Sequence, residues 1–155
     1  MILVRKIVWS CLALMIICGL GFNRQAFGAN IILKDLQANT VNLESFNGSP
    51  RILIFWTTWC PYCRAAIKSL TQISAQLQQE GVLVFAIDVN ESPVRVRNFL
   101  KNSPVNFKVL LDGEAQLASS YNVNGVPTYV LINRAGRIVA KRNSFPSDYK
   151  DLLAR

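Results

Sequence analysis

Residues 51–63 read RILIFWTTWCPYC, and this stretch predicts the fold around it. Its first part, residues 51–57, is an apolar and aromatic run typical of a central strand buried on both faces. After the run, residues 61–79 carry apolar side chains at spacings of three and four, which indicates one face of a helix. Cys60 and Cys63 therefore lie where a buried strand passes into a long helix.

This position suits a pair of reacting thiols. Two cysteines three residues apart on the first turn of a helix lie on one face, close enough to form and break a disulfide with little backbone motion. Cys60 is expected to face unpaired backbone N–H groups and the positive end of the helix dipole, which stabilise a thiolate. The spacing thus predicts Cys60 as the nucleophile and the more buried Cys63 as the thiol that resolves a mixed disulfide.

Working outward, the chain alternates strands and helices. Strands are expected at residues 31–36, 41–43, 82–89, 108–111, 128–132 and 137–142, and helices at 93–100, 114–121 and 147–153. Gly81 is placed to end the long helix, Ser92 and Ser147 are expected N-caps, and residues 133–136 form a hairpin turn. This order predicts an α/β fold, a three-layer α/β/α sandwich with a central mixed sheet and a short N-terminal hairpin.

The start of the chain is a separate segment. Arg5 and Lys6 precede an apolar stretch at residues 7–22, and a small-x-small site at residues 26–28 follows it. Residues 1–28 are thus expected to be a signal peptide or an N-terminal membrane anchor, and residues 29–155 the folded domain. Both alternatives place the domain outside the cytoplasm, in the periplasm or on the outer face of the membrane. A third alternative is a buried N-terminal helix, although the stretch lacks an amphipathic period.

The cysteine count narrows the chemistry. Cys11 and Cys18 lie inside the targeting segment, where the bulky Ile17 argues against a lipoprotein site, so the domain keeps Cys60 and Cys63. No metal site is expected, because two thiols and no histidine fall short of the usual four soft or imidazole ligands. A purely structural disulfide would close a loop of only a few residues and stabilise little.

The composition argues against a disordered chain and against a nucleic-acid-binding protein. The chain has 155 residues, of which 51% are hydrophobic and 17% charged, so one domain with a real core is expected rather than disorder. Three of the charges behind the net +8 belong to Arg5, Lys6 and Arg24. The remaining basic residues are scattered without a basic run, and no nucleic-acid partner is expected.

Residues 55–64, FWTTWCPYCR, resemble the active site of thioredoxin-like proteins, especially the extracytoplasmic thiol–disulfide reductases of the TlpA/ResA type. Further similar stretches follow in the same order and spacing over residues 31–155: GV at 81–82, VNES at 89–92, VLLD at 109–112, GVPT at 125–128 and LIN at 131–133. The resemblance implies a thioredoxin-like fold. It also implies a cis Pro127 facing the cysteines, with the Val126 backbone pairing with a client strand, and Trp59 on an exposed rim.

From this resemblance, the expected client-contacting residues are Trp59, Pro61, Tyr62, Val126 and Pro127. Two acids that related proteins carry are absent. The buried acid six positions before the first cysteine is Ile54 here, and the glutamate three positions after the second is Ala66. Glu44, Asp88 and Glu91 are the acids that could replace them as acceptors of the Cys63 proton.

Taken together, the sequence predicts an extracytoplasmic enzyme that reduces disulfides in client proteins through a Cys60/Cys63 dithiol–disulfide cycle. The domain is expected to be a monomer without a cofactor that receives electrons from a membrane donor. The resemblance suggests cytochrome c maturation as one client route. A disulfide oxidase or isomerase on the same fold is one alternative, because direction depends on reduction potential. A non-catalytic binding module is another, and metal delivery is disfavoured by the absence of histidine.

Overall fold

A computed structural model describes residues 32–155. The expectations for residues 1–28, and the first residue of the strand predicted at 31–36, lie outside this part of the chain. The elements follow the order β1 (Ile32–Asp35), β2 (Thr40–Asn42), η1 (Leu43–Phe46), β3 (Arg51–Trp56), α2 (Pro61–Gln79), β4 (Leu83–Val89), α3 (Pro93–Asn102), β5 (Lys108–Asp112), α4 (Gln116–Ser120), β6 (Thr128–Ile132), β7 (Ile138–Arg142) and α5 (Tyr149–Ala154).

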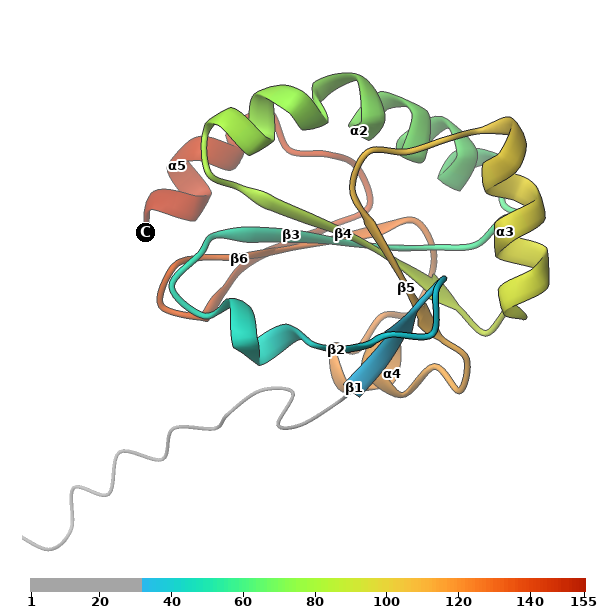
Figure 1. Ribbon diagram of the computed structural model, residues 1–155. Helices are drawn as coiled ribbons and strands as arrows, with labels where there is room; N and C mark the ends of the chain where they lie inside the picture. Colours follow the sequence, from blue (N-terminus) through green and yellow to red (C-terminus); the bar gives the residue numbers. More distant parts are fainter. Residues whose placement is uncertain (1–31) are drawn as a thin grey trace, which may run out of the picture.

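The strands of residues 32–155 form one mixed sheet in the order β2-β1-β5-β4-β3-β6-β7 (Figure 1). The central strand β3 runs parallel to β4 and antiparallel to β6, and β4 runs parallel to β5. β1 and β2 form the expected N-terminal hairpin. Helices α2, α3 and α5 lie on one side of the sheet, and η1 and α4 lie on the other, so the predicted three-layer α/β/α sandwich is confirmed.

The sheet has a hydrophobic core on each side, and successive side chains of β3 point alternately into one and the other. Ile52, Ile54 and Trp56 pack under α2, whereas Leu53 and Phe55 pack toward η1 and α4. All five side chains are fully buried, which explains why the strand has no polar alternation. Burying both faces of β3 fixes the position of its carboxyl end, where the two cysteines follow.

Helix α2 begins and ends as predicted from the sequence. Pro61 occupies the first helical position, where a missing N–H costs nothing, and Cys60 is the N-cap. At the other end, Gly81 has φ of +72°, a left-handed conformation that glycine adopts without a Cβ clash. The Val82 N–H then bonds to the Leu77 carbonyl, and the chain turns directly into β4.

Three local expectations were wrong. Ser147 does not cap the last helix; α5 starts at Tyr149, whose ring packs 5.2 Å from that of Phe145, and the N-cap Asp148 makes no side-chain cap bond. The helix expected at 114–121 is shorter, because Ala115 is left-handed with φ of +54°. The strand expected at 41–43 ends at Asn42, which caps the short helix η1 by accepting from the Glu44 N–H, so Leu43 lies in that helix.

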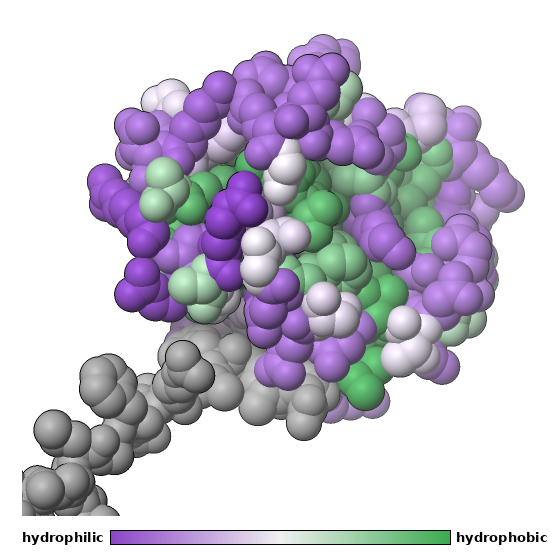
Figure 2. All heavy atoms as spheres, turned by 60° about the vertical axis from the view of Figure 1, so that its left-hand side comes forward, coloured by the Kyte–Doolittle hydropathy of each residue, from purple (hydrophilic) through white to green (hydrophobic). Residues whose placement is uncertain are grey.

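Polar residues cover most of the face that Figure 2 presents, and apolar residues come to the surface near its middle. Within residues 32–155, no helix combines the length and the apolar character needed to cross a bilayer.

Candidate active site

Cys60 and Cys63 lie together at the carboxyl end of β3. Cys60 adopts an extended backbone at the N-cap of α2, and its sulfur accepts a hydrogen bond from the Cys63 N–H at 3.3 Å. Both thiols are free in this structure. The Cys60 sulfur is therefore held at the amino end of α2, facing the first turn of the helix.

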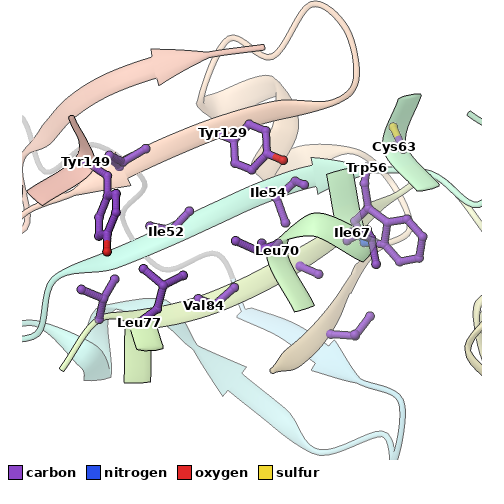
Figure 3. Packing of buried hydrophobic residues seen from close by; sticks show 14 of the residues in the cluster. Ile52, Ile54, Trp56, Cys63, Ile67, Leu70, Leu77, Val84, Tyr129 and Tyr149 are labelled. Carbon is purple, nitrogen blue, oxygen red and sulfur yellow. The ribbon is translucent and has the colours of Figure 1, made fainter. Parts of the chain in front are cut away.

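The two thiols differ in exposure and surroundings. Cys60 is 6% exposed and Cys63 is fully buried among the apolar side chains under α2, close to Trp56 and Ile67 (Figure 3). Burial raises the pKa of the Cys63 thiol, the neighbouring Cys60 raises it further, and the adjacent Thr57 opposes the rise. Cys63 is therefore held as a neutral thiol at neutral pH.

This difference gives a testable order of reaction. At pH 7, iodoacetamide should modify Cys60 at least about tenfold faster than Cys63, because Cys63 is fully buried and held neutral whereas Cys60 keeps some accessible surface. Peptide mass spectrometry of the reduced protein after timed quenching measures both rates. Faster modification of Cys63 would reverse the roles predicted for the two thiols.

The loop before β6 faces Cys60. The Val126–Pro127 peptide bond is cis, and the Cys60 thiol donates to the Val126 carbonyl at 3.7 Å. Thr128 Oγ1 donates to the Gly125 carbonyl at 2.7 Å, which closes the loop from within. The structure thus brings Val126 and Pro127 to the nucleophile position from 66 residues away in sequence.

Aromatic side chains surround this point on the surface. Trp59 is 59% exposed and Tyr62 is 79% exposed, whereas Phe55 and Trp56 are core residues, as the sequence predicted. A groove of about 540 Å³ extends from Trp59 and Val126 between the β4–α3 and α4–β6 connections. Every side chain that lines it is uncharged: Thr57, Trp59, Val89, Asn90, Ala115, Ala118, Ser119, Asn122, Val123, Asn124 and Val126, with Gly125.

A second set of contacts holds the turn between β3 and Cys60. Glu91 accepts from the Thr58 N–H and, at 2.7 Å, from the Thr58 hydroxyl. Arg95 pairs with the same carboxylate at 3.0 Å, and the Glu91 side chain is only 3% exposed. From the other side, Arg64 Nε donates to the Thr58 carbonyl at 2.7 Å. We call these contacts of Thr58, Arg64, Glu91 and Arg95 the Thr58 clamp.

The structure also places the three acids considered as substitute bases. Glu44 lies in η1, before the amino end of β3, whereas the cysteines follow its carboxyl end, so Glu44 lies at the wrong end of the strand. Asp88 lies near the carboxyl end of β4, and Glu91 follows that strand and belongs to the clamp.

The two positions without an acid are well defined. Ile54 is fully buried opposite Tyr129 of β6, and Ala66 is partly buried on the cysteine side of α2. Burial and the nearby Cys63 raise the pKa of Tyr129 to about 12, so this phenol stays neutral.

Sequence reasoning missed the clamp itself. Thr58 and Arg64 appeared only as part of the resembling stretch at residues 55–64, and no local pattern links them to an acid 33 residues away. The signal that could have found it is the parallel pairing of β3 with β4, because parallel strands bring their carboxyl ends to one edge of the sheet. Among residues 32–155, no group of three or more histidine, cysteine or acidic side chains could hold a metal ion.

Known proteins resemble this chain over nearly its whole length. The family model Redoxin matches residues 24–153. The thiol-disulfide oxidoreductase ResA of Bacillus subtilis (strain 168) is 29% identical over 167 residues, covering 96% of this chain and 93% of ResA. ResA of Bacillus cereus (strain ZK / E33L) is 28% identical over 151 residues, covering 88% and 87%.

Solved structures agree with these relatives. A secreted disulfide oxidoreductase of Mycobacterium tuberculosis, homologous to E. coli DsbE, is 26% identical with a TM-score of 0.66, covering 80% of this chain and 92% of that one. StoA from Bacillus subtilis, 22% identical with a TM-score of 0.64 and covering 80% and 93%, shares the fold.

Proposed function

Because this chain belongs to the Redoxin family and is a thioredoxin-fold thiol–disulfide oxidoreductase, we propose that it reduces disulfides of client proteins outside the cytoplasm with Cys60 and Cys63. The observation that carries the proposal is the arrangement at the end of β3. There the thiol at the helix N-cap faces the Val126 carbonyl of a cis-proline loop, and its fully buried partner lies one turn along α2.

The cycle follows from this geometry. The Cys60 thiolate attacks one sulfur of a client disulfide, the client S–S bond breaks, and the second client sulfur leaves as a thiolate that takes up a proton. Cys63 then loses its proton and attacks the Cys60 sulfur of the mixed disulfide. This step forms the Cys60–Cys63 disulfide and releases the first client sulfur as a thiol. Two electrons from a donor restore the dithiol.

The client is proposed to dock as an extended segment. Its backbone would pair with Val126 beside Pro127, and its side chains would contact the exposed Trp59 and Tyr62 and the first turn at Pro61. The uncharged lining of the groove favours client segments without charge next to the reacting cysteine.

The location and partners belong to the same proposal. The basic and apolar pattern of residues 1–28 supports export or anchoring of the domain at residues 29–155, and the M. tuberculosis relative is described as secreted. A membrane donor would then supply electrons to a monomeric domain, and apocytochrome c is one proposed client. Mass spectrometry of the protein from membrane and extracytoplasmic fractions tests whether residues 1–28 are removed.

The reduction potential of the Cys60/Cys63 couple tests the direction of the reaction. A reductase should equilibrate at about −230 mV or below, near thioredoxin and the glutaredoxins. The measurement is redox titration in defined glutathione or dithiothreitol buffers, with catalysis of insulin reduction by dithiothreitol as the activity assay. A potential near about −120 mV would make the protein an oxidase instead. A protein that catalyses no insulin reduction would be a binding module.

A further inference from the structure

Asp88 is a buried acid that the cycle above does not use. It is the sixth residue of β4, fully inaccessible to solvent, and neither of its carboxyl oxygens receives a hydrogen bond from any N–H or O–H donor within residues 32–155. Leaving a buried carboxylate without a donor is costly, and such a group takes up a proton instead. Asp88 therefore differs from an ordinary structural aspartate.

Asp112 shows what a satisfied buried aspartate looks like in the same sheet. It lies at the end of the neighbouring strand β5 and is 2% exposed. Its Oδ1 accepts from the Leu117 N–H at 3.1 Å and its Oδ2 from the Ala118 N–H at 2.8 Å, so both oxygens hold the start of α4. Nothing equivalent reaches Asp88 in the described part of the chain.

Asp88 lies on the α2 side of the sheet among apolar side chains. Because side chains alternate along a strand, Asp88 shares its side of the sheet with Val84 and Ala86, which pack under α2. The neighbouring strands present the apolar residues Trp56 and Leu111 at the same level.

The charged groups that shift the pKa of Asp88 lie in the β4–α3 connection and in α3. Burial, a side-chain hydrogen bond with Glu91 and the Glu91 charge raise the pKa of Asp88 to about 8, and Arg95 opposes the rise. On α2, which packs against β4, the titratable and charged groups near this end are Cys60, Cys63 and Arg64, and Arg64 is turned to the Thr58 carbonyl.

We propose that Asp88 is a positioning residue that holds the Thr58 clamp by donating its proton to a hydrogen bond with Glu91. Glu91 already accepts from the Thr58 N–H, the Thr58 hydroxyl and Arg95, so a protonated Asp88 adds a fourth donor. Thr58 precedes Cys60 by two residues. The proton on Asp88 thus helps to fix the turn that presents Cys60.

The protonation state of Asp88 determines how the Thr58 clamp should change with pH. While Asp88 keeps its proton, it is a neutral donor and the clamp is intact. As the pH rises through about 8, the proton is lost, and two carboxylates face each other, with Arg95 as the guanidinium that lowers the Asp88 pKa. Their repulsion pushes Glu91 away from Asp88 and loosens its bonds to Thr58.

The Thr58 amide reports this event directly, because its N–H is the donor to Glu91. The protein is taken in its oxidised form, which contains no Cys60 or Cys63 thiol to titrate, and Thr58 is followed by ¹H–¹⁵N NMR from pH 6.5 to 9.5. The wild type should show a titration with a midpoint near 8. Asp88→Asn should abolish it, because an amide donates to Glu91 at every pH. Asp112→Asn, the matched buried control, should retain it.

Reactivity of the reduced protein gives the second readout. The ratio of the Cys60 alkylation rate of Asp88→Asn to that of wild type should be about threefold larger at pH 9 than at pH 6.5, since only the wild type loses the clamp. A flat Thr58 signal in wild type, a titration that persists in Asp88→Asn, or a constant rate ratio would overturn the proposal.

The inference rests on the proposed role of Cys60 only for this second readout. If the protein failed to reduce insulin while the Thr58 titration depended on Asp88, the proposed function would fall and the positioning role would stand. Circular dichroism melts of each variant establish that the fold is retained.

Discussion

Cys63→Ser is expected to turn the protein into a covalent trap. Cys60 would still attack a client disulfide, but no thiol would remain one turn along α2 to attack the mixed disulfide, so adducts should accumulate and insulin turnover should fall by about 10³-fold or more. Purified Cys63→Ser incubated with an oxidised model client should give a higher band on a non-reducing gel, and dithiothreitol should remove it.

Cys60→Ser is the matched control, because it changes one sulfur in the same turn and leaves Cys63 buried. It should form no adduct and show no turnover, since Cys63 is fully inaccessible. Adducts of equal yield in both variants would mean that Cys63 can act as the nucleophile. If Cys63→Ser formed no adduct although its Cys60 reacted with iodoacetamide, a binding module with a static cysteine pair would be the better description.

The fold could be predicted because its signals are local. The central strands β3 and β4 appear as largely apolar runs, RILIFW and LVFAIDV, and α2 carries both of its boundaries in sequence, at Pro61 and Gly81. At α5, where the structure departs from expectation, the first residue of the helix makes a contact with a distant segment. Tyr149 donates its hydroxyl to Glu80 at 2.7 Å, a contact between residues 69 positions apart that no capping pattern around Ser147 could reveal.

The site was predictable only in part for the same reason. Cys60 and Cys63 are neighbours in sequence, and the loop at Val126 and Pro127 was identified by resemblance. The Thr58 clamp joins residues from β3, α2 and the β4–α3 connection, and its existence depends on the strand order. Local patterns carry no information about such contacts between distant segments.

The two missing acids lead to the second large effect, which concerns the resolving step. Cys63 must lose its proton before it attacks, and burial raises the pKa of that thiol. Asp88 and Glu91 lie near the turn, yet Glu91 is occupied by Thr58 and Arg95, and burial raises the pKa of Asp88 to about 8, so that it keeps its proton at pH 7. Tyr129 near Cys63 is a neutral phenol. No base free to accept the proton is identified among these neighbours.

We therefore expect that Cys63 attack limits turnover at pH 7. Below the raised thiol pKa, the thiolate fraction grows tenfold with each pH unit, so the rate of mixed-disulfide resolution should rise about tenfold per unit from pH 6 to 9. Stopped-flow mixing of reduced protein with an excess of a fluorescent model disulfide measures this step. Repeating it with Asp88→Asn separates the slope from any loosening of the Thr58 clamp.

Ala66→Glu supplies the missing base on the same helix. Position 66 follows Cys63 by three residues, so the two side chains lie one above the other on α2, and Ala66 is only partly buried, which leaves room for a carboxylate. General-base catalysis by this group should accelerate resolution at pH 7 by about 10²-fold and flatten its pH dependence. Ala66→Gln, with the same shape and no charge, should do neither. A wild-type rate that is already fast and independent of pH would show that another group takes the Cys63 proton.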